Sequence, residues 1–363
     1  MAQSDDLRFM NLALALGRRG LGRTWPNPAV GAVIVKDGTI VGRGWTQPGG
    51  RPHAEIEALR RAGDAALGAT LYVTLEPCSH HGKSPPCADA IVAAGVARVV
   101  SALEDPNPEV AGGGHARLRA AGIAVEVGVG EPQARRDHAG HIRCMRDGRP
   151  HVRLKLAVSA DGKVAAAGRH PLPITGEVAR ERVHLMRAQS DAILIGIGTV
   201  LADDPLLTCR LPGMAAVSPV RVVLDSALRL SLGSRLAQSA REVPVWVIAG
   251  VDAPPAAEQS LRTCGVEVWR VEAANGRLGV AAVLKLLAAR GITRLLVEGG
   301  PTVAAAFLGA DLVDEAMLFA SPNLVGADGI DAFNPSAEIA LLRLKQGEAE
   351  QIGPDRLEVY RRG

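Results

Sequence analysis

The sequence predicts two consecutive domains of the α/β class, and three observations support this fold. The chain has 363 residues, which exceeds the roughly 100–200 residues of a typical single domain. Apolar runs that resemble strands alternate with helix-like segments in both halves, as in layered α/β domains. A charged stretch that closes with Gly148 and Pro150 interrupts this alternation. We therefore place the boundary near 147–151, between domains over 1–148 and 149–363.

The N-terminal half opens with apolar residues at helical spacing and then forms a predicted β-hairpin. Two apolar runs flank the turn sequence Lys36-Asp37-Gly38, which is typical of a hairpin. The predicted elements are a helix over 5–20, a hairpin over 29–35 and 39–45, a helix over 53–63, a strand over 69–75, a helix over 87–95, a strand over 96–103, a helix over 114–122 and a strand over 123–129.

The alternation restarts after the boundary, and no internal repeat relates the two halves. One strand ends in Gly299 and Gly300 and is followed by a helix with Pro301 at its first position, where proline is favoured. The predicted elements are strands over 151–159, 220–225, 243–250, 266–271 and 293–300, a strand-to-helix unit over 190–202, and helices over 279–291 and 301–309.

The composition excludes several classes of protein. The net charge of +3 is too small for a polybasic surface that binds nucleic acid or a membrane. Aromatic residues make up 3%, so base-stacking platforms for single strands are not expected. No apolar run reaches the roughly 18–20 residues needed to span a bilayer, and the acidic N-terminus lacks the features of a signal peptide. The 5 cysteines argue against a disulfide framework and predict a reducing, cytoplasmic compartment.

His53, Cys78 and Cys87 have the residue types of a catalytic zinc site, which uses three protein ligands and leaves one position for water. We expect both cysteines at helix N-termini, where the helix dipole favours the thiolate. Glu55 lies two residues after His53 and can move a proton to or from the water without being a ligand. Nucleobase deaminases carry this arrangement as H-x-E and P-C-x-x-C.

Two histidines in the loop between the cysteines, His80 and His81, are rival ligands. We expect them to shape a substrate pocket instead. A fourth metal bond from either would favour a closed, purely structural zinc site. The remaining cysteines, Cys144, Cys209 and Cys264, show no ligand spacing and are interpreted as small core or surface residues.

The segments PNPAVGAVIV (26–35), HAEIEAL (53–59), TLEPCSHHGKSPPCADAI (74–91) and DPNPEVAG (105–112) resemble the deaminase half of the bifunctional riboflavin-biosynthesis deaminase/reductases. Eight residues separate the two cysteines, a spacing typical of that family and different from P-C-x-x-C. The resemblance implies zinc ligation by His53, Cys78 and Cys87, a proton donor and acceptor role for Glu55, and a substrate contact by Asn27. The alternative for Asn27 is a turn residue between two prolines.

The C-terminal half lacks the G-x-G-x-x-G fingerprint of ordinary dinucleotide-binding folds. The strand–Gly–Gly–helix unit over 295–308 can also bind a dinucleotide. Gly299 and Gly300 allow the backbone to approach a pyrophosphate closely, and a helix N-terminus favours its negative charge. Such turns also occur in many other α/β proteins, so this unit alone is a weak signal.

A wider pattern resembles the reductase half of the same family: LKLAVSADGKVA (154–165), ITG (174–176), LMRAQSDAILIGIGTVLADDPLLTCR (185–210), VLDS (223–226) and VEGGPT (297–302). Lys155 lies on the first predicted strand of this half, and three roles are open for it. It polarises the reacting group, it pairs with Glu298, or it is a solvated lysine without a role in the site. The resemblance implies cofactor contacts by Ala157, Thr199, Asp203, Ser226, Gly300, Pro301, Thr302, Val303, Ala304, Ala305 and Ala306, and substrate contacts by Arg187, Leu207, Arg210 and Glu298. Two arginines suit a phosphate group.

One departure from the family concerns the loop before ITG. Pro171 and Pro173 stand where the family usually has a serine and a tryptophan, so the contacts of that loop are not carried over. Either the loop binds through its backbone or the reductase half is altered. For the pair Asp203-Asp204, a helix-end cap is preferred over a metal site, because adjacent side chains point in different directions.

The resemblance implies a cytidine-deaminase-like three-layer α/β/α domain with one zinc ion and a dihydrofolate-reductase-like α/β domain that uses NADPH. The implied reactions are hydrolytic deamination of 2,5-diamino-6-(5-phosphoribosylamino)pyrimidin-4-one and reduction of its ribosyl chain to a ribityl chain. We expect a cytoplasmic homo-oligomer with a small phosphorylated pyrimidine as substrate and no nucleic-acid or membrane partner. The alternatives are a deaminase of another nucleobase, a deaminase with an impaired or regulatory reductase-like half, and a non-enzymatic protein with structural zinc.

Overall fold

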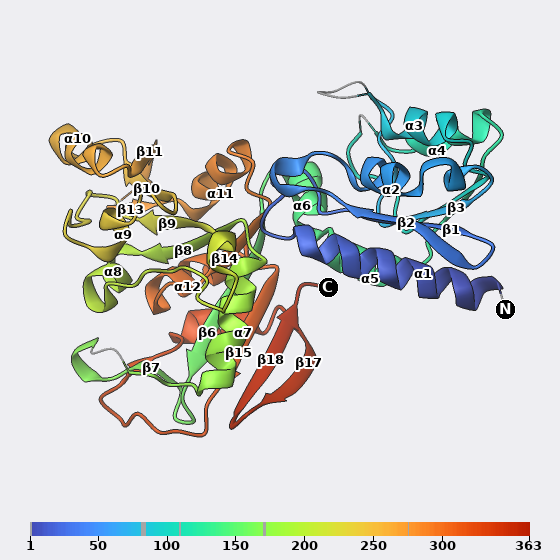
Figure 1. The fold of residues 1–363 in the computed structure, drawn as a ribbon. Helices are drawn as coiled ribbons and strands as arrows, with labels where there is room; N and C mark the ends of the chain where they lie inside the picture. Colours follow the sequence, from blue (N-terminus) through green and yellow to red (C-terminus); the bar gives the residue numbers. More distant parts are fainter. Residues whose placement is uncertain (1, 81–84, 109, 170–171, 275) are drawn as a thin grey trace. The chain divides into compact units, whose positions relative to one another are not determined.

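The computed structural model describes residues 2–80, 85–108, 110–169, 172–274 and 276–363. The chain divides into two compact units, Met1–Arg149 and Pro150–Gly363. Both units are α/β, with helices packed on a central sheet (Figure 1). In the described ranges, no helix combines the length and hydropathy that a membrane span requires.

The first unit contains a five-stranded mixed sheet in the order β2-β1-β3-β4-β5. β1 is antiparallel to both β2 and β3, whereas β3, β4 and β5 are parallel. Figure 1 shows α1 and α5 on one side of this sheet and α2, α3 and α4 on the other. The elements are α1 (Ala2–Gly17), β1 (Gly31–Lys36), β2 (Thr39–Trp45), α2 (Ala54–Ala62), β3 (Thr70–Val73), α3 (Cys87–Ala93), β4 (Arg98–Ser101), α4 (Gly113–Ala120), β5 (Ala124–Val127), α5 (Glu131–Asp137) and α6 (Ala139–Asp147).

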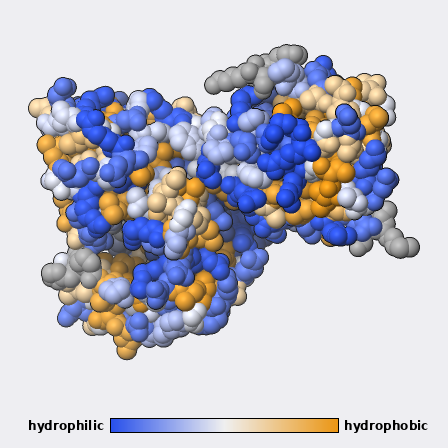
Figure 2. Space-filling model, in the orientation of Figure 1, coloured by the Kyte–Doolittle hydropathy of each residue, from blue (hydrophilic) through white to orange (hydrophobic). Residues whose placement is uncertain are grey.

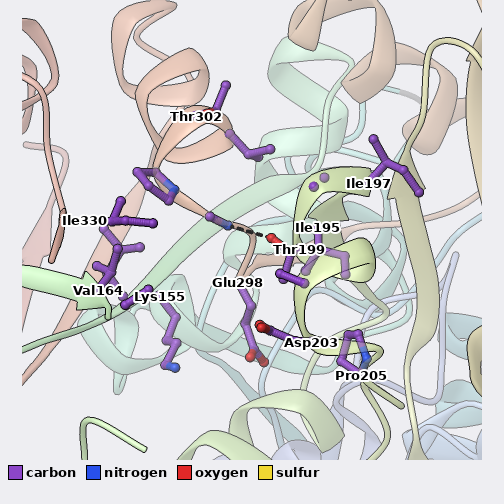
Figure 3. A pocket seen from close by; sticks show the side chains of 18 of the residues that line it. Lys155, Val164, Ile195, Ile197, Thr199, Asp203, Pro205, Glu298, Thr302 and Ile330 are labelled. Atoms are coloured by element: carbon purple, nitrogen blue, oxygen red, sulfur yellow. Dashed lines mark hydrogen bonds between the residues drawn. The ribbon is translucent and has the colours of Figure 1, made fainter. Parts of the chain in front are cut away.

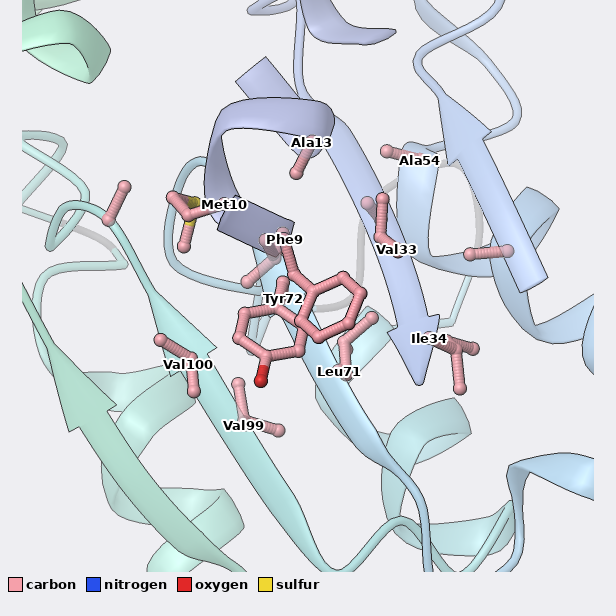
Figure 4. Packing of buried hydrophobic residues seen from close by; sticks show 14 of the residues in the cluster. Phe9, Met10, Ala13, Val33, Ile34, Ala54, Leu71, Tyr72, Val99 and Val100 are labelled. Carbon is pink, nitrogen blue, oxygen red and sulfur yellow. The ribbon is translucent and has the colours of Figure 1, made fainter. Parts of the chain in front are cut away.

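The core of the first unit requires close packing of helices on its sheet. A Cβ atom on Gly31 would lie 1.9 Å from the carbonyl oxygen of Ala13 in α1, and one on Gly44 would lie 2.3 Å from that of Ala54 in α2. Aliphatic side chains and the Phe9 and Tyr72 rings, with centroids 5.3 Å apart, fill the space between α1 and the sheet (Figure 4). The glycines therefore fix the distance of both helix layers from the sheet.

The second unit contains a nine-stranded sheet in the order β11-β10-β9-β8-β14-β6-β15-β18-β17. Its strands are parallel up to β15, and β18 and β17 close it as an antiparallel hairpin. The elements are β6 (His151–Val158), β7 (Lys163–Ala165), α7 (Glu177–Ala188), β8 (Ala192–Gly196), α8 (Ile197–Asp203), β9 (Val220–Leu224), α9 (Arg235–Gln238), β10 (Val245–Gly250), α10 (Pro255–Thr263), β11 (Glu267–Val271), β12 (Ala273–Ala274), β13 (Arg277–Leu278), α11 (Val280–Ala289), β14 (Arg294–Val297), α12 (Pro301–Gly309), β15 (Glu315–Ala320), β16 (Ile330–Asp331), α13 (Pro335–Leu341), β17 (Lys345–Ile352) and β18 (Asp355–Arg361).

The charged stretch at the predicted boundary forms two helices, α5 and α6, that belong to the first unit. Their exposed faces carry ion pairs one helical turn apart, such as Glu131 with Arg135. Two buried histidines hold the segment to the core: His138 Nε2 lies 3.1 Å from Thr74 Oγ1, and His141 Nε2 lies 2.9 Å from Asp105 Oδ1. The sequence reading assigned no helix here, since apolar periodicity is absent.

Polar residues cover much of the molecular face shown in Figure 2, with apolar residues between them. Some large apolar side chains are exposed, among them Leu324 and Leu342 in the second unit. Scattered apolar residues of this kind are normal on folded proteins.

The packing of α1 on the first sheet gives a testable prediction. Gly31→Ala should destabilise the first unit by about 1–3 kcal/mol, because its methyl group collides with backbone rather than with a side chain that can rotate away. Hydrogen–deuterium exchange of the β1 and α1 peptides would measure this. Gly309→Ala is the control, since a Cβ atom there meets nothing within 4 Å. Unchanged exchange in Gly31→Ala would contradict the packing argument.

Candidate active sites

The three predicted metal ligands of the first unit come together. His53 is the residue directly before α2, and Cys87 is the first residue of α3. His53 Nδ1 lies 3.7 Å from Cys78 Sγ and 3.3 Å from Cys87 Sγ. A tetrahedral zinc ion with bonds of 2.0–2.3 Å has ligand-to-ligand edges of about 3.5 Å, so these three atoms fit zinc in both chemistry and spacing.

The expectation that Cys78 begins a helix is wrong. Cys78 lies in the irregular segment after β3, and α3 begins only at Cys87, directly after Pro85 and Pro86. Its sulfur still meets a helix N-terminus: the backbone N–H of Cys87 donates to Cys78 Sγ at 3.3 Å, and that of Ala88 donates to the Cys78 carbonyl at 3.1 Å. The predicted stabilisation of the thiolate is therefore supplied by α3.

The charges around this cluster favour one thiolate. The hydrogen bond from Cys87 lowers the pKa of the Cys78 thiol to about 4 against the effect of burial. The same hydrogen bond, together with burial, raises the pKa of Cys87. Glu55 is 3% exposed on the first turn of α2. Burial raises the pKa of its carboxyl group, which the nearby His53 opposes, so Glu55 can hold a proton closer to neutral pH than an exposed glutamate.

Other predicted residues of the first unit lie in different surroundings. His80 is exposed and does not belong to the metal cluster, and His81 lies outside the described residues. Asn27 is half-buried, and its side-chain amide donates to the carbonyl of Gly50, 23 residues along the chain, at 2.8 Å. The sequence reading missed Glu76 and Asp105, two buried carboxylates beside this site. Their signals were present in the motifs EPC and DPNP.

Two adjoining cavities of about 560 and 530 Å³ lie in the second unit at the carboxyl ends of β6, β8 and β14. Ligands of parallel α/β sheets bind at this edge. Their shared wall consists of Lys155, Ala157, Val164, Ala165, Arg187, Asp203 and Glu298. Figure 3 shows Lys155, Asp203 and Glu298 on one side of the larger cavity, with Thr199 and Thr302 farther along it.

Most predicted cofactor contacts face the larger cavity, which we call the first cavity. Its lining includes Ala157, Thr199, Asp203, Gly300, Pro301, Thr302 and Val303, but not Ser226, Ala304, Ala305 or Ala306. Ala304 lies on the buried side of α12 and is fully enclosed. Leu207 lines the first cavity, and Arg210 lines the smaller, second cavity.

The two glycines after β14 have different roles. A Cβ atom on Gly299 would lie 2.6 Å from the Cα atom of Ile195, so this glycine serves the packing of β14 against β8 rather than a ligand. Gly300 faces the first cavity, and its N–H donates to Thr199 Oγ1 at 3.3 Å (Figure 3). Only Gly300 therefore suits the predicted close approach to a pyrophosphate.

A buried ion pair organises the shared wall. Arg187 donates from Nε to Glu298 Oε1 at 2.7 Å and from Nη2 to Glu298 Oε2 at 2.8 Å, and a third bond reaches the Thr208 carbonyl. Burial acts to raise the pKa of Glu298, but the charge and hydrogen bonds of Arg187 outweigh it and leave that pKa lowered. Burial also lowers the pKa of Lys155, and the negative charge of Glu298 opposes this lowering.

Basic side chains gather at the second cavity beside this pair. Arg180, His184 and Arg210 line it. In the described part of the chain, the Arg210 guanidinium has no hydrogen-bond or ion-pair partner. Burial, and to a smaller extent the neighbouring Arg187, lower the pKa of Arg210. His184 Nδ1 accepts the backbone N–H of Arg210 at 3.3 Å, which leaves the neutral ring a donor at Nε2.

Pro173, Asp203 and Asp204, which the sequence singled out, lie at or near the two cavities. Pro173 lines the second cavity, and Pro171 lies outside the described residues. Asp203 lines both cavities. Asp204 Oδ1 accepts the N–H of Arg235, the first residue of α9, at 2.9 Å, which is a helix-end cap.

Comparisons with known proteins cover both units. A family described as the RibD C-terminal domain matches residues 150–357, and one described as the cytidine and deoxycytidylate deaminase zinc-binding region matches residues 3–103. Riboflavin biosynthesis protein RibD of Escherichia coli (strain K12) is 42% identical, over 97% of this chain and 98% of its own. The protein of the same name from Aquifex aeolicus (strain VF5) is 38% identical over 100% of both chains.

Two solved structures are similar over nearly the whole chain. RibD of Acinetobacter baumannii, form 1, has a TM-score of 0.88 and 39% identity and covers 99% of both chains. A diaminohydroxyphosphoribosylaminopyrimidine deaminase/5-amino-6-(5-phosphoribosylamino)uracil reductase from Thermotoga maritima has a TM-score of 0.85 and 36% identity over 100% of both. The predicted fold class, a deaminase-like α/β domain followed by a reductase-like α/β domain, is confirmed.

The ion pair of the shared wall gives a second prediction. Glu298→Gln should reduce the free energy of unfolding of the second unit by about 3–5 kcal/mol, because it leaves Arg187 charged and buried without its partner. Glu350→Gln is the control, since Glu350 pairs with Arg182 at the surface with 52% of its side chain exposed; it should change stability by no more than about 0.5 kcal/mol. Equal effects in urea unfolding would refute the importance of the buried pair.

Proposed function

The chain belongs to the family of bifunctional riboflavin biosynthesis proteins, which join a deaminase to a reductase, and we infer from this premise which residues carry each reaction. The protein is a riboflavin-pathway enzyme that deaminates a phosphorylated diaminopyrimidine and then reduces its ribosyl chain, with zinc and NADPH as cofactors. Similarity over the full length of relatives that carry both activities is the observation on which this conclusion rests.

For the deaminase we propose residues 1–148 as the domain, with His53, Cys78 and Cys87 as the zinc ligands. Bound zinc supplies a Lewis acid that makes water nucleophilic near neutral pH. Glu55 accepts a proton from the attacking water and donates a proton to the leaving amino nitrogen. Its position supports this role, since Glu55 is buried on the first turn of α2, two residues after His53. The exposure of His80 supports an open site over a closed structural one.

For the reductase we propose residues 149–363, with NADPH in the first cavity and substrate in the second. Bound NADPH supplies the hydride. The two cavities meet at Lys155, Asp203 and Glu298, so these side chains would border the reacting carbon. Lys155 is held near Glu298 and can polarise the oxygen at that carbon or donate a proton to it. Gly300 and Thr302, at the start of α12, would approach the cofactor phosphates.

We propose that Arg210 is the main cation for the substrate phosphate. The sequence reading assigned this role to Arg187 and Arg210 together, but Arg187 is committed to Glu298. Arg210 is unpaired in the described chain and lines the second cavity, where His184 orients its backbone. Asn27, Leu207 and the cofactor residues that do not line the first cavity remain predictions from the resemblance.

A cytoplasmic location and a homo-oligomeric state are also proposals. All 5 cysteines are free thiols, which supports a reducing compartment. Pro173 departs from the family pattern described above, and it lines the second cavity. This observation favours a second candidate function, a deaminase whose reductase half is impaired.

The function is tested by following ammonia release and NADPH absorbance together, using zinc-loaded protein and the diaminopyrimidine substrate. We expect ammonia first and NADPH oxidation after it. Ammonia without NADPH oxidation would support the impaired reductase, and no ammonia would refute the substrate assignment.

Glu55→Gln separates the two reactions. It should bind zinc and lower ammonia release by about 10²–10⁴-fold, but it should oxidise NADPH normally when the deaminated substrate is supplied directly. Glu57→Gln is the matched control on the same helix, where Glu57 pairs with Arg60. Ammonia release by Glu55→Gln at the parent rate would show that Glu55 has no such role.

Arg210→Ala tests the phosphate site. It should raise the KM of the reductase for its phosphorylated substrate by about tenfold or more, since a charge-assisted hydrogen bond is lost, and leave deamination unchanged. Arg182→Ala is the control, because this arginine of α7 pairs with Glu350 at the surface. An unchanged KM would remove Arg210 from the phosphate site.

A further inference from the structure

Glu76 is a buried carboxylate that the deaminase mechanism above does not use. The residue is 4% exposed and lies two positions before Cys78. Its Oε2 accepts the backbone N–H groups of Asp105 at 3.1 Å and Gly112 at 3.0 Å, and its Oε1 accepts that of His115 at 3.1 Å. A buried carboxylate needs such bonds to offset its lost hydration. Three backbone segments are thereby tied to one side chain.

The partners of Glu76 are backbone amides and not cations. In the part of the chain that the structure describes, no lysine or arginine forms an ion pair with it. His115 Nδ1 lies 3.8 Å from Glu76 Oε1, and burial lowers the pKa of this imidazole, so the ring is neutral at pH 7. The carboxylate of Glu104, which is exposed, lies within 4.8 Å of the Glu76 carboxylate and the His115 ring. The Glu76 carboxylate therefore acts on the position of the backbone.

Two of the three amides belong to the start of α4. Gly112 directly precedes this helix and offers no capping side chain, and His115 is its third residue. The first N–H groups of a helix have no partner within the helix, and negative charge is favourable there. Glu76 thus caps α4 from a segment 36 residues away.

The glycines at the start of α4 allow the metal-ligand segment to lie against the helix. A Cβ atom on Gly114 would lie 2.0 Å from the Pro77 carbonyl oxygen, and one on Gly113 would lie 2.8 Å from Ser79 Oγ. Pro77 and Ser79 flank Cys78 on both sides. The contact between Pro77 and α4 is consequently one that only glycine permits at position 114.

We propose that Glu76 is a positioning residue for the metal centre, which holds Cys78 at ligand distance by fixing its segment to the start of α4 and to Asp105. This inference rests on the proposed zinc deaminase site. Cys78 lies in neither a helix nor a strand, so its position depends on anchors. Cys87 and Ala88 anchor it on the α3 side through the Cys78 sulfur and carbonyl. Glu76 supplies the anchor on the α4 side.

The test uses the full-length chain, freed of metal and titrated with cobalt(II), whose thiolate charge-transfer absorption reports the ligand geometry. Glu76→Gln should weaken cobalt binding by about tenfold or more, and the saturated protein should show a changed charge-transfer band. Its amide keeps the size of the side chain but presents an NH₂ group to N–H donors. Gly114→Ala should change the same band, because it separates Pro77 from α4.

Glu131→Gln is the control and should bind cobalt as the parent does, because Glu131 pairs with Arg135 on the exposed face of α5. The NADPH reaction of the second unit, assayed with deaminated substrate, checks that each variant chain is otherwise intact. Parent affinity and the parent absorption band in Glu76→Gln would overturn the proposal. The proposal would also be overturned if the first unit of Glu76→Gln stayed unfolded even with saturating cobalt. Glu76 would then be required for folding in general and not for the position of Cys78. Absence of zinc-dependent ammonia release by the parent would count against the proposed function, whereas the cobalt comparison between variants would still decide the role of Glu76.

Discussion

Both candidate sites depend on the ends of parallel strands, where backbone hydrogen bonding stops and consecutive loops converge. In the first unit, the parallel pairing of β3 and β4 brings the segment of Cys78 beside the loop that starts at Asp105. In the second unit, β6, β8 and β14 end around the two cavities. Each edge contains a buried glutamate shortly after a strand, Glu76 after β3 and Glu298 after β14. The two carboxylates are stabilised differently, Glu76 by backbone N–H groups and Glu298 by a guanidinium. Each one joins segments that are distant in sequence into one site.

The pairing of Glu298 decides how charge is distributed over the reductase cavities. Because Arg187 is neutralised by this carboxylate, it orders the wall but adds little positive potential. Arg180 and Arg210 remain to give the second cavity a positive character, which suits a phosphate dianion. The first cavity is lined largely by backbone and aliphatic groups such as Ile195, Val303 and Ile330, which suits a cofactor that also carries flat rings. The difference between the walls supports the assignment of cofactor and substrate to separate cavities.

The sequence was sufficient where apolar periodicity or a dense motif was present. The hairpin of β1 and β2, the strand β14 with α12 after it, and the cluster of His53, Cys78 and Cys87 all follow from local patterns. The helices α5 and α6 lack an apolar stripe and are fixed by His138 and His141, whose partners lie far along the chain. β17 is exposed over nearly its whole length and shows no alternation, so only its pairing with β18 makes it a strand. The roles of Gly299 and Glu76 depend on tertiary distances that no local pattern contains.

The loop before α7 borders the proposed phosphate site of the second unit. Its far end is well anchored: the N–H of Gly176 donates to Asp355 at 2.7 Å, and the Thr175 carbonyl accepts a bond from Arg180 at 2.8 Å. Pro173 lines the second cavity but has no N–H to offer, and its neighbour Leu172 has no polar side chain. In the proposed phosphate site, anion binding would then depend on Arg180, His184 and Arg210, which are cations or ring donors rather than backbone amides. Charge–charge attraction at partly exposed groups is screened by salt. If these groups hold the phosphate as proposed, the KM of the reductase for its phosphorylated substrate should rise with ionic strength.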